Sequence, residues 1–239
     1  MKEKIIPSAP FKNMAEIEVL AHKSKGKVER IQIDVCDGKF VKNTSWPFTE
    51  YAKPDFEKLG KRDDLDVFLP LWENLDYSVD LMVENPEKYI ESFLVYGIDE
   101  VIIHYRSLQN VDEQFATISK MCEDFDLNLV LAIDVQTDFE KFLDFANKHS
   151  ESIKAFQVMG IENIGVQGQD FAEESLAIVE KLKINFPEKN IYFDGGINDE
   201  TIEDLKNAGV DIFCVGSYLT KADDFTWNLQ TLKQILHVI

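Results

Sequence analysis

Two aspartates stand out because each ends a short run of β-branched or aromatic residues. Asp34 lies in the segment IQIDVCDG, and Asp194 lies in the segment IYFDGGI. A carboxylate at the end of a buried strand can give or take a proton, and two such groups facing one substrate could act as acid and base. The chemistry therefore depends on whether the fold brings these two strand ends together.

The rest of the chain predicts a fold that can do so. Segments with helical periodicity alternate with short apolar runs, and the glycines at 97 and 209 are helix-stop signals. Strand alternating with helix eight times predicts one (β/α)8 barrel over residues 1–239, close to the roughly 250 residues typical of that fold. The runs suited to buried parallel strands are residues 4–8, 29–34, 77–81, 100–104, 128–133, 154–158, 190–193 and 211–215. The clearest helical segments are residues 87–96, 111–125, 139–148, 172–185 and 200–208.

One stretch, at about 39–74, breaks this alternation. It is longer than the other connections, and it predicts a loop with one short helix that covers the active site. Its aromatic and proline residues include Trp46, Pro47, Pro54, Pro70 and Trp72.

Polar residues fall where a barrel of this kind carries its chemistry, at the C-terminal ends of the strands. Gln32 and Asp34 are two residues apart and therefore point to the same side of their strand. Asp80 likewise shares a face with Ser78 and Met82. These positions predict one polar site at that end of the barrel.

The charge balance narrows the class of partner. The chain has 44 acidic and 25 basic residues, a net charge of -19, which disfavours binding to nucleic acid or to an anionic membrane. A small phosphorylated substrate is still compatible, because backbone amides at helix N-termini and in glycine-rich loops can hold one phosphate.

Cysteine usage and hydropathy indicate the compartment. Cys36, Cys122 and Cys214 are an odd number without C-x-x-C spacing, so they predict neither a disulfide framework nor a zinc knuckle. No apolar run of about 18 residues occurs, and the N-terminal segment has no signal-peptide core. We expect a soluble, cytoplasmic protein.

Seven short motifs, taken in order, resemble those of the ribulose-phosphate 3-epimerase family. Each motif is weak alone, but their order and spacing together carry the resemblance, which runs from Pro7 to about Ser217. The motifs are Pro7-Ser8, QIDVCDGKFV at 32–41, DLMV at 80–83, His104, GVQGQ at 165–169, DGG at 194–196 and Gly216-Ser217.

The resemblance implies an isomerase that inverts C3 of a ketopentose 5-phosphate through an enediolate. It implies that Asp34 and Asp194 act as catalytic acid and base and also bind a divalent metal. In the family two histidines complete the metal site, whereas this chain has Gln32 and Asp80 at those positions. Oxygen donors favour Mg or Mn over Zn, Fe or Co. The expected ligands are thus Gln32, Asp34, Asp80 and Asp194, with no organic cofactor.

The resemblance also implies residues that bind the sugar phosphate. Several of them have an ordinary structural interpretation as well: His104 could equally satisfy a strand-end hydrogen bond, and the methionines could be core fillers. Asp37, in an Asp-Gly pair, is expected to form a turn. The expected phosphate-binding residues are Gly168, Gly195, Gly196, Gly216 and Ser217. The expected substrate contacts are Ser8, Met82, His104 and Met159.

Two alternatives stay open: an epimerase for another ketose phosphate, and a non-catalytic sugar-phosphate-binding barrel that has lost its metal. Other chemistries of this barrel fit less well. A Schiff-base aldolase needs a lysine near the C-terminal end of a strand, yet Lys154 opens its strand. A decarboxylase of the orotidine-phosphate class needs a Lys-x-Asp-x-x-Lys pattern, which the segment at Asp34 lacks. A homo-oligomer is compatible with the sequence.

Overall fold

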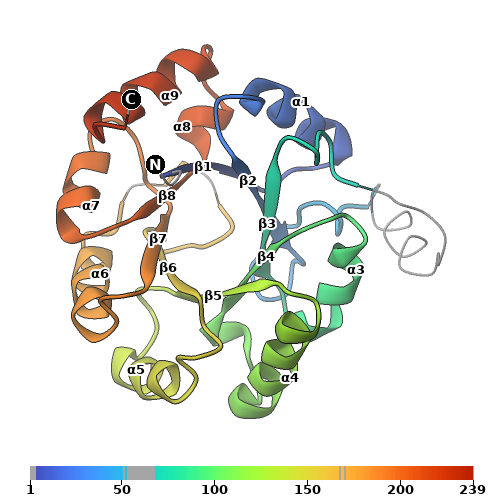
Figure 1. Ribbon diagram of the computed structural model, residues 1–239, viewed down its shortest axis with the longest axis vertical. Helices are drawn as coiled ribbons and strands as arrows, with labels where there is room; N and C mark the ends of the chain where they lie inside the picture. The colour runs from blue at the N-terminus through green and yellow to red at the C-terminus, as the bar shows by residue number, and fades with distance from the viewer. Residues whose placement is uncertain (1–3, 51, 53–67, 167, 170, 239) are drawn as a thin grey trace. The chain divides into compact units, whose positions relative to one another are not determined.

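The structure is a computed structural model that describes residues 4–50, 52, 68–166, 168–169 and 171–238. Eight parallel strands form a closed barrel in the order β1 to β8, which confirms the (β/α)8, or TIM, barrel (Figure 1). The strands begin and end within about two residues of the predicted runs. They are β1 Ile5–Ala9, β2 Arg30–Cys36, β3 Asp76–Met82, β4 Glu100–His104, β5 Asn128–Ile133, β6 Ala155–Met159, β7 Asn190–Asp194 and β8 Ile212–Val215.

In the described part of the chain, a helix or 3-10 turn follows every strand except β2, and the short helix expected at 39–74 is not among the described elements. The helix predicted at 87–96 is split into a 3-10 turn and a short α-helix, and Asn85 adopts a left-handed conformation (φ 55°) directly before the turn begins at Pro86. Gly97 and Gly209 both have positive φ, as their helix-stop roles require. The helices are α1 Met14–Ser24, α3 Ile90–Leu94, α4 Val111–Asp124, α5 Phe139–Lys148, α6 Glu174–Asn185, α7 Ile202–Ala208, α8 Ser217–Thr220 and α9 Phe225–Ile235, with 3-10 turns η1 Pro86–Lys88 and η2 Tyr105–Ser107.

Residues 10–129 form one compact unit of the chain. In it β2 pairs with β3 so that Gln32 lies opposite Ser78 and Asp34 lies opposite Asp80. Both strands are buried over nearly their whole length. At their opposite, N-terminal end, the guanidinium of Arg30 donates to both carboxylate oxygens of Asp99. The register therefore fixes which polar side chains become neighbours.

The expected cover segment at 39–74 is described only in part, since residues 51 and 53–67, including Pro54, lie outside the described residues. In its described portion Trp46 is buried and packs edge-on against Phe93 and Tyr96, with ring centroids 5.9 and 5.2 Å away. Trp46 thus anchors the chain after β2 to the helix layer of this unit.

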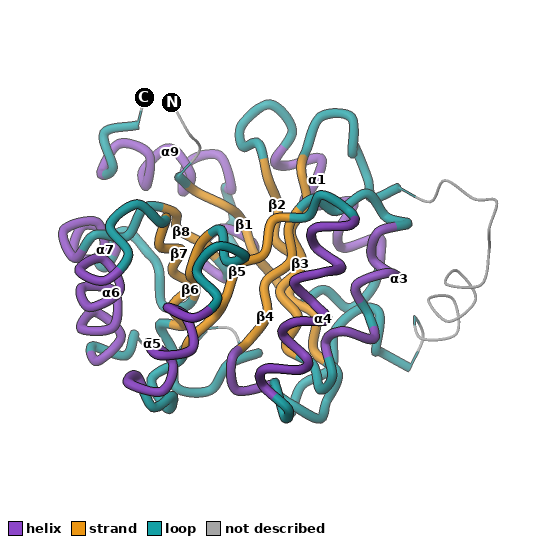
Figure 2. The backbone as a smooth tube through the Cα atoms, turned by 60° about the horizontal axis from the view of Figure 1, so that its bottom comes forward, coloured by secondary structure: helices purple, strands orange, loops and turns teal. Residues whose placement is uncertain are grey.

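Residues 1–9 and 130–239 form the other compact unit. Here β6 pairs with β7, β7 with β8, and β8 with β1. Helices α5, α6 and α7 lie on the outer side of these strands (Figure 2). The fully buried rings of Phe156, Phe193 and Phe213 fill the core of the unit. None of the helices in the described part of the chain is long and apolar enough to cross a membrane.

Candidate active site

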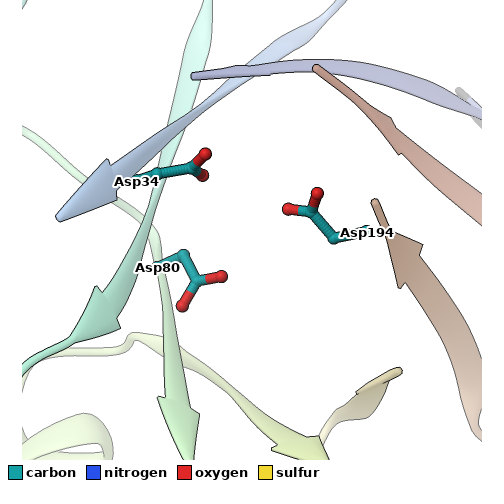
Figure 3. A group of neighbouring side chains, drawn as sticks. All are labelled: Asp34, Asp80 and Asp194. Atoms are coloured by element: carbon teal, nitrogen blue, oxygen red, sulfur yellow. The ribbon is translucent and has the colours of Figure 1, made fainter. Parts of the chain in front are cut away.

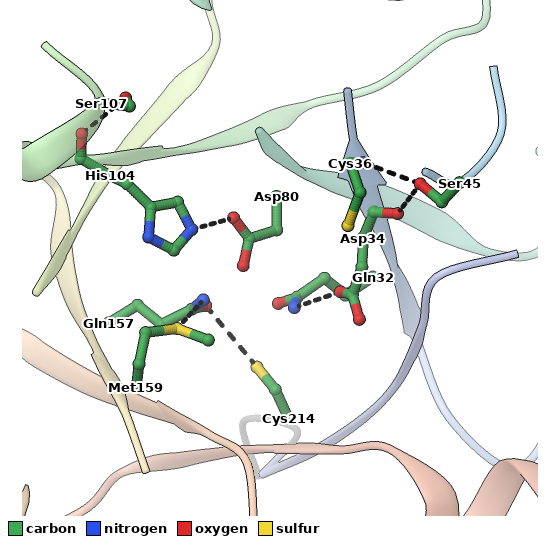
Figure 4. A network of polar contacts seen from close by, with 10 residues as sticks. All are labelled: Gln32, Asp34, Cys36, Ser45, Asp80, His104, Ser107, Gln157, Met159 and Cys214. Atoms are coloured by element: carbon green, nitrogen blue, oxygen red, sulfur yellow. Dashed lines mark hydrogen bonds and ion pairs between the residues drawn. The ribbon is translucent and has the colours of Figure 1, made fainter. Parts of the chain in front are cut away.

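Asp34 and Asp80 are neighbouring buried carboxylates at the C-terminal ends of β2 and β3 (Figure 4). Each offers a carboxylate oxygen within 4.8 Å of the other's. Their exposed fractions are 7% and 0%. Two carboxylates this close and this poorly solvated repel each other, so one of them holds a proton or both share a cation.

Asp34 is the carboxyl group of this pair whose pKa is shifted. Burial, and next the negative charge of Asp80, raise the pKa of Asp34 from 3.8 to about 7. The amide of Gln32 donates to Asp34 Oδ1 at 3.0 Å and opposes this shift, as does the nearby His104. Asp34 can therefore both take and give a proton close to neutral pH, which suits a general acid or base.

Asp80 is held by His104, which ends β4. Oδ1 of Asp80 lies 2.7 Å from Nε2 of His104, and both side chains are buried. Ser107 donates to the main-chain oxygen of His104 at 2.7 Å, and the ring of Phe40 lies 5.5 Å from the imidazole. The strand-end hydrogen bond expected as one role of His104 is thus formed, and its contact with substrate stays a prediction.

Ser45 is a further determinant of the site, one that the sequence did not reveal. Its hydroxyl donates to the main-chain oxygen of Asp34 at 2.6 Å and accepts from the main-chain N–H of Cys36 at 2.8 Å (Figure 4). Its own N–H bonds to Cys36 O at 3.0 Å. Nothing in the spacing around a single serine in a loop signals such a clamp, because the clamp depends on the path of the loop.

Asp37 has the structural role expected of it. Its Oδ1 accepts from the N–H groups of Lys39 and Phe40, and its Oδ2 accepts from Glu84 N at 2.9 Å. The carboxylate therefore ties the turn after β2 to the chain after β3. The clamp at Ser45 and this tie together fix the main chain at Asp34 and directly after it.

Asp194 ends β7 in the other unit and is 8% exposed. Its main-chain oxygen accepts from Gly160 N at 2.7 Å. A Cβ on Gly160 would lie 2.2 Å from the ring of Phe193 and 2.6 Å from the oxygen of Gly195, so only glycine fits there. Sequence reasoning passed over Gly160, whose requirement arises from a close approach between the ends of β6 and β7.

The model of the ribulose-phosphate 3 epimerase family matches residues 4–220. The chain belongs to this family. The ribulose-phosphate 3-epimerase of Eremothecium gossypii is 26% identical over 229 residues, covering 94% of this chain and 89% of that protein. The enzyme of the same name from Aquifex aeolicus is 25% identical, covering 89% and 86%. The family resemblance inferred from the motifs is thus confirmed.

Solved structures of other barrels show the same fold at lower identity. The 3-hexulose-6-phosphate synthase from Salmonella typhimurium aligns with a TM-score of 0.70 at 15% identity, covering 99% of this chain and 100% of that one. The 3-keto-L-gulonate-6-phosphate decarboxylase from Vibrio cholerae aligns with a TM-score of 0.68 at 13% identity, covering 99% and 98%. These likenesses concern the fold alone.

The donor set of this epimerase-family member fits a divalent cation. Asp34, Asp80 and Asp194 are all buried, and their carboxylates are of the kind that could hold a metal ion (Figure 3). Carboxylate oxygens suit Mg or Mn better than they suit softer ions. Gln32, at the position of a family histidine, turns its amide nitrogen toward Asp34. A cation would also relieve the repulsion between Asp34 and Asp80.

The glycines expected to bind phosphate also have packing reasons to be glycine. Gly195 and Gly196 have φ of 109° and 70°, and a Cβ on them would lie 2.8 Å from Ile161 and 2.9 Å from Phe171. Gly216 precedes α8, which begins at Ser217, and Gly168 is exposed with φ 80°. Gln167 of the same expected loop lies outside the described residues.

The remaining expected substrate contacts lie inside their strands. Ser8 is buried in β1, and Met82 and Met159 are the buried last residues of β3 and β6. The amide of Gln157 approaches the sulfur of Met159 at 3.4 Å. The burial of these side chains is compatible with a role in filling the core, and it is equally compatible with a place in the lining of the candidate site.

The raised pKa of Asp34 predicts a pH dependence of stability in the metal-free protein. In the unfolded chain the carboxyl ionises near 3.8, but in the folded protein it keeps its proton up to about pH 7. Between these values the folded state binds more protons than the unfolded state, so the contribution of Asp34 to the free energy of unfolding falls as pH rises from about 4 to about 7.

Asp34→Asn removes this contribution. Urea unfolding of the two proteins in chelator, at several pH values across that window, should show the free energy of unfolding of the wild type declining relative to that of Asp34→Asn as pH rises. A constant difference between the two proteins would contradict the raised pKa.

Proposed function

We propose that this protein is an epimerase that inverts C3 of a ketopentose 5-phosphate, with Asp34 and Asp194 as the acid–base pair. The observation that carries the proposal is the carboxyl of Asp34, which is buried at the end of β2 and has its pKa raised to about 7. Membership in the ribulose-phosphate 3 epimerase family supports this reaction class. An isomerase of this kind needs no organic cofactor.

In the proposed reaction one carboxylate removes the proton from C3, which lies next to the ketone at C2, and leaves an enediolate. The other carboxyl group then delivers a proton to the opposite face of C3, and the configuration is inverted. Which aspartate acts as base depends on the direction of the reaction. The closed parallel barrel supports this assignment, because Asp34 and Asp194 both stand at C-terminal strand ends.

We further propose that Asp34, Asp80, Asp194 and the amide oxygen of Gln32 are the ligands of a divalent cation, with Mg or Mn preferred over Zn, Fe or Co. When bound, the cation would stabilise the negative charge of the enediolate. Support comes from the all-oxygen donor set and from the short separation of Asp34 and Asp80.

We propose that residues 1–239 form one barrel domain, which works in the cytoplasm and binds neither nucleic acid nor membranes. The sugar phosphate is proposed to lie at the C-terminal ends of the strands. Main-chain N–H groups after the seventh and eighth strands bind phosphate in many such barrels. The proposed phosphate contacts are Gly168, Gly195, Gly196, Gly216 and Ser217. The proposed sugar contacts are Ser8, Met82, His104 and Met159.

A second candidate function is sugar-phosphate binding without turnover. The observation that favours it is the replacement of both metal-ligand histidines of the family by Gln32 and Asp80. An epimerase for another ketose phosphate is the narrower alternative, because the described site does not fix the length of the sugar.

Elemental analysis of the purified protein, followed by an assay of ribulose 5-phosphate conversion to xylulose 5-phosphate, tests the proposal. Chelator-treated protein would receive Mg, Mn, Zn, Fe or Co singly, and we expect turnover with Mg or Mn. Turnover of other ketose phosphates only would favour the narrower alternative. No turnover with any of these ions, combined with thermal stabilisation by the sugar phosphate, would favour the binding protein.

A further inference from the structure

We infer that His104 is a positioning residue that holds Asp80 in the orientation in which its carboxylate serves a divalent cation. The inference rests on the metal site of the proposed function and adds a residue to it that is not among the ligands. It concerns binding of the cation and not the proton transfer itself.

The contact between the side chains of His104 and Asp80 is direct and buried. Nε2 of His104 lies 2.7 Å from Oδ1 of Asp80, and the exposed fractions of the two side chains are 2% and 0%. A carboxylate only accepts hydrogen bonds, so Nε2 carries the proton and donates it. Because a carboxylate has two oxygens, Asp80 can accept from His104 through one of them while it serves as a ligand.

The imidazole is itself held in place. Ser107 fixes the main chain of His104 through its 2.7 Å hydrogen bond to the carbonyl oxygen, and Phe40 packs against the ring at 5.5 Å with an interplanar angle of 53°. A side chain fixed on its main chain and on its ring can impose one orientation on its partner.

The contact between His104 and Asp80 also explains how position 80 in β3 can carry an aspartate instead of a histidine. A histidine ligand is oriented by its own second nitrogen, whereas a carboxylate beside Asp34 needs a donor to fix its rotation and to offset the repulsion between the two acids. β4 lies next to β3 in the barrel and ends at His104, which supplies that donor.

Binding of Mn2+ to chelator-treated protein, measured by titration calorimetry, tests the inference without an activity assay. His104→Leu removes the donor, and we expect the affinity for Mn2+ to fall by about 10- to 100-fold. His104→Gln keeps an N–H close to the place of Nε2, and its affinity should stay near the wild-type value. His149→Leu is the matched control, since that half-buried imidazole packs on Phe145 at the end of α5.

Three outcomes would overturn the inference: unchanged affinity in His104→Leu, equal losses in the Leu and Gln variants, or no Mn2+ binding by the wild type. Circular dichroism reports folding. If His104→Leu does not fold, His104→Asn replaces it, because its shorter amide cannot reach the Nε2 position and must also weaken binding. The epimerase assay stands apart from these titrations: turnover by the wild type without any Mn2+ binding defeats the inference and spares the proposed acid–base pair.

Discussion

Asp34→Asn and Asp194→Asn are each expected to lower epimerisation by about 10²- to 10⁴-fold, while the protein stays folded. An amide is nearly isosteric with a carboxyl group but cannot exchange a proton with C3. Each variant keeps one of the two carboxyl groups, so exchange of the C3 proton with heavy water should persist for only one of the two epimeric substrates. That epimer would identify the face on which each aspartate acts.

The measurement is the rate of conversion in both directions, together with incorporation of deuterium at C3. Asp134→Asn is the matched control: this buried carboxylate follows β5 and accepts from Gln136 N at 3.0 Å and from Thr137 Oγ1 at 2.9 Å, a turn-forming role. Its turnover should stay close to that of the wild type. Near-normal rates in Asp34→Asn or Asp194→Asn would refute the acid–base assignment.

Gln32→His combined with Asp80→His is expected to change the metal that the protein takes up. Imidazole nitrogens suit Zn, Fe and Co, whereas the present oxygen donors suit Mg and Mn. The preference should therefore move toward the softer ions, both in the metal content of the purified protein and in the ion that best restores turnover. The double variant also removes the carboxylate that accepts from His104.

Gln32→His alone separates the two contributions, because it leaves the Asp80–His104 pair in place. It should shift the preference less than the double variant does. If neither variant changes metal content or metal dependence, Gln32 and Asp80 do not face a bound cation.

The barrel could be predicted from the sequence because its strands are buried on both faces and therefore read as continuous apolar runs. β4 is an example: the apolar run predicts a strand over residues 100–104, and Glu100–His104 is the observed strand. The polar residues at or near the ends of these runs marked Asp34, Asp80 and Asp194 as candidate site residues, because such barrels carry their chemistry at the C-terminal strand ends.

What the sequence could not reveal depends on contacts between segments distant along the chain. The bond from His104 to Asp80 spans 24 positions, and the need for glycine at 160 comes from the ring of Phe193.

The start of helix α7 depends instead on a local contact. The helix begins at Ile202, not at 200, because the side chain of Asn198 accepts from the N–H of Glu200 and of Thr201. Periodicity does not encode such local competition for main-chain groups.

The hydroxyl of Ser45 has a consequence for altering this protein. It bridges Asp34 and Cys36 through main-chain atoms only, so it ties the loop after β2 to the end of the strand that carries Asp34. Any graft or shortening of that loop intended to admit another sugar must preserve a hydroxyl at position 45. A loop that omits it would lose the hydrogen bonds to Asp34 O and from Cys36 N, and would loosen the segment that directly follows the proposed catalytic carboxyl.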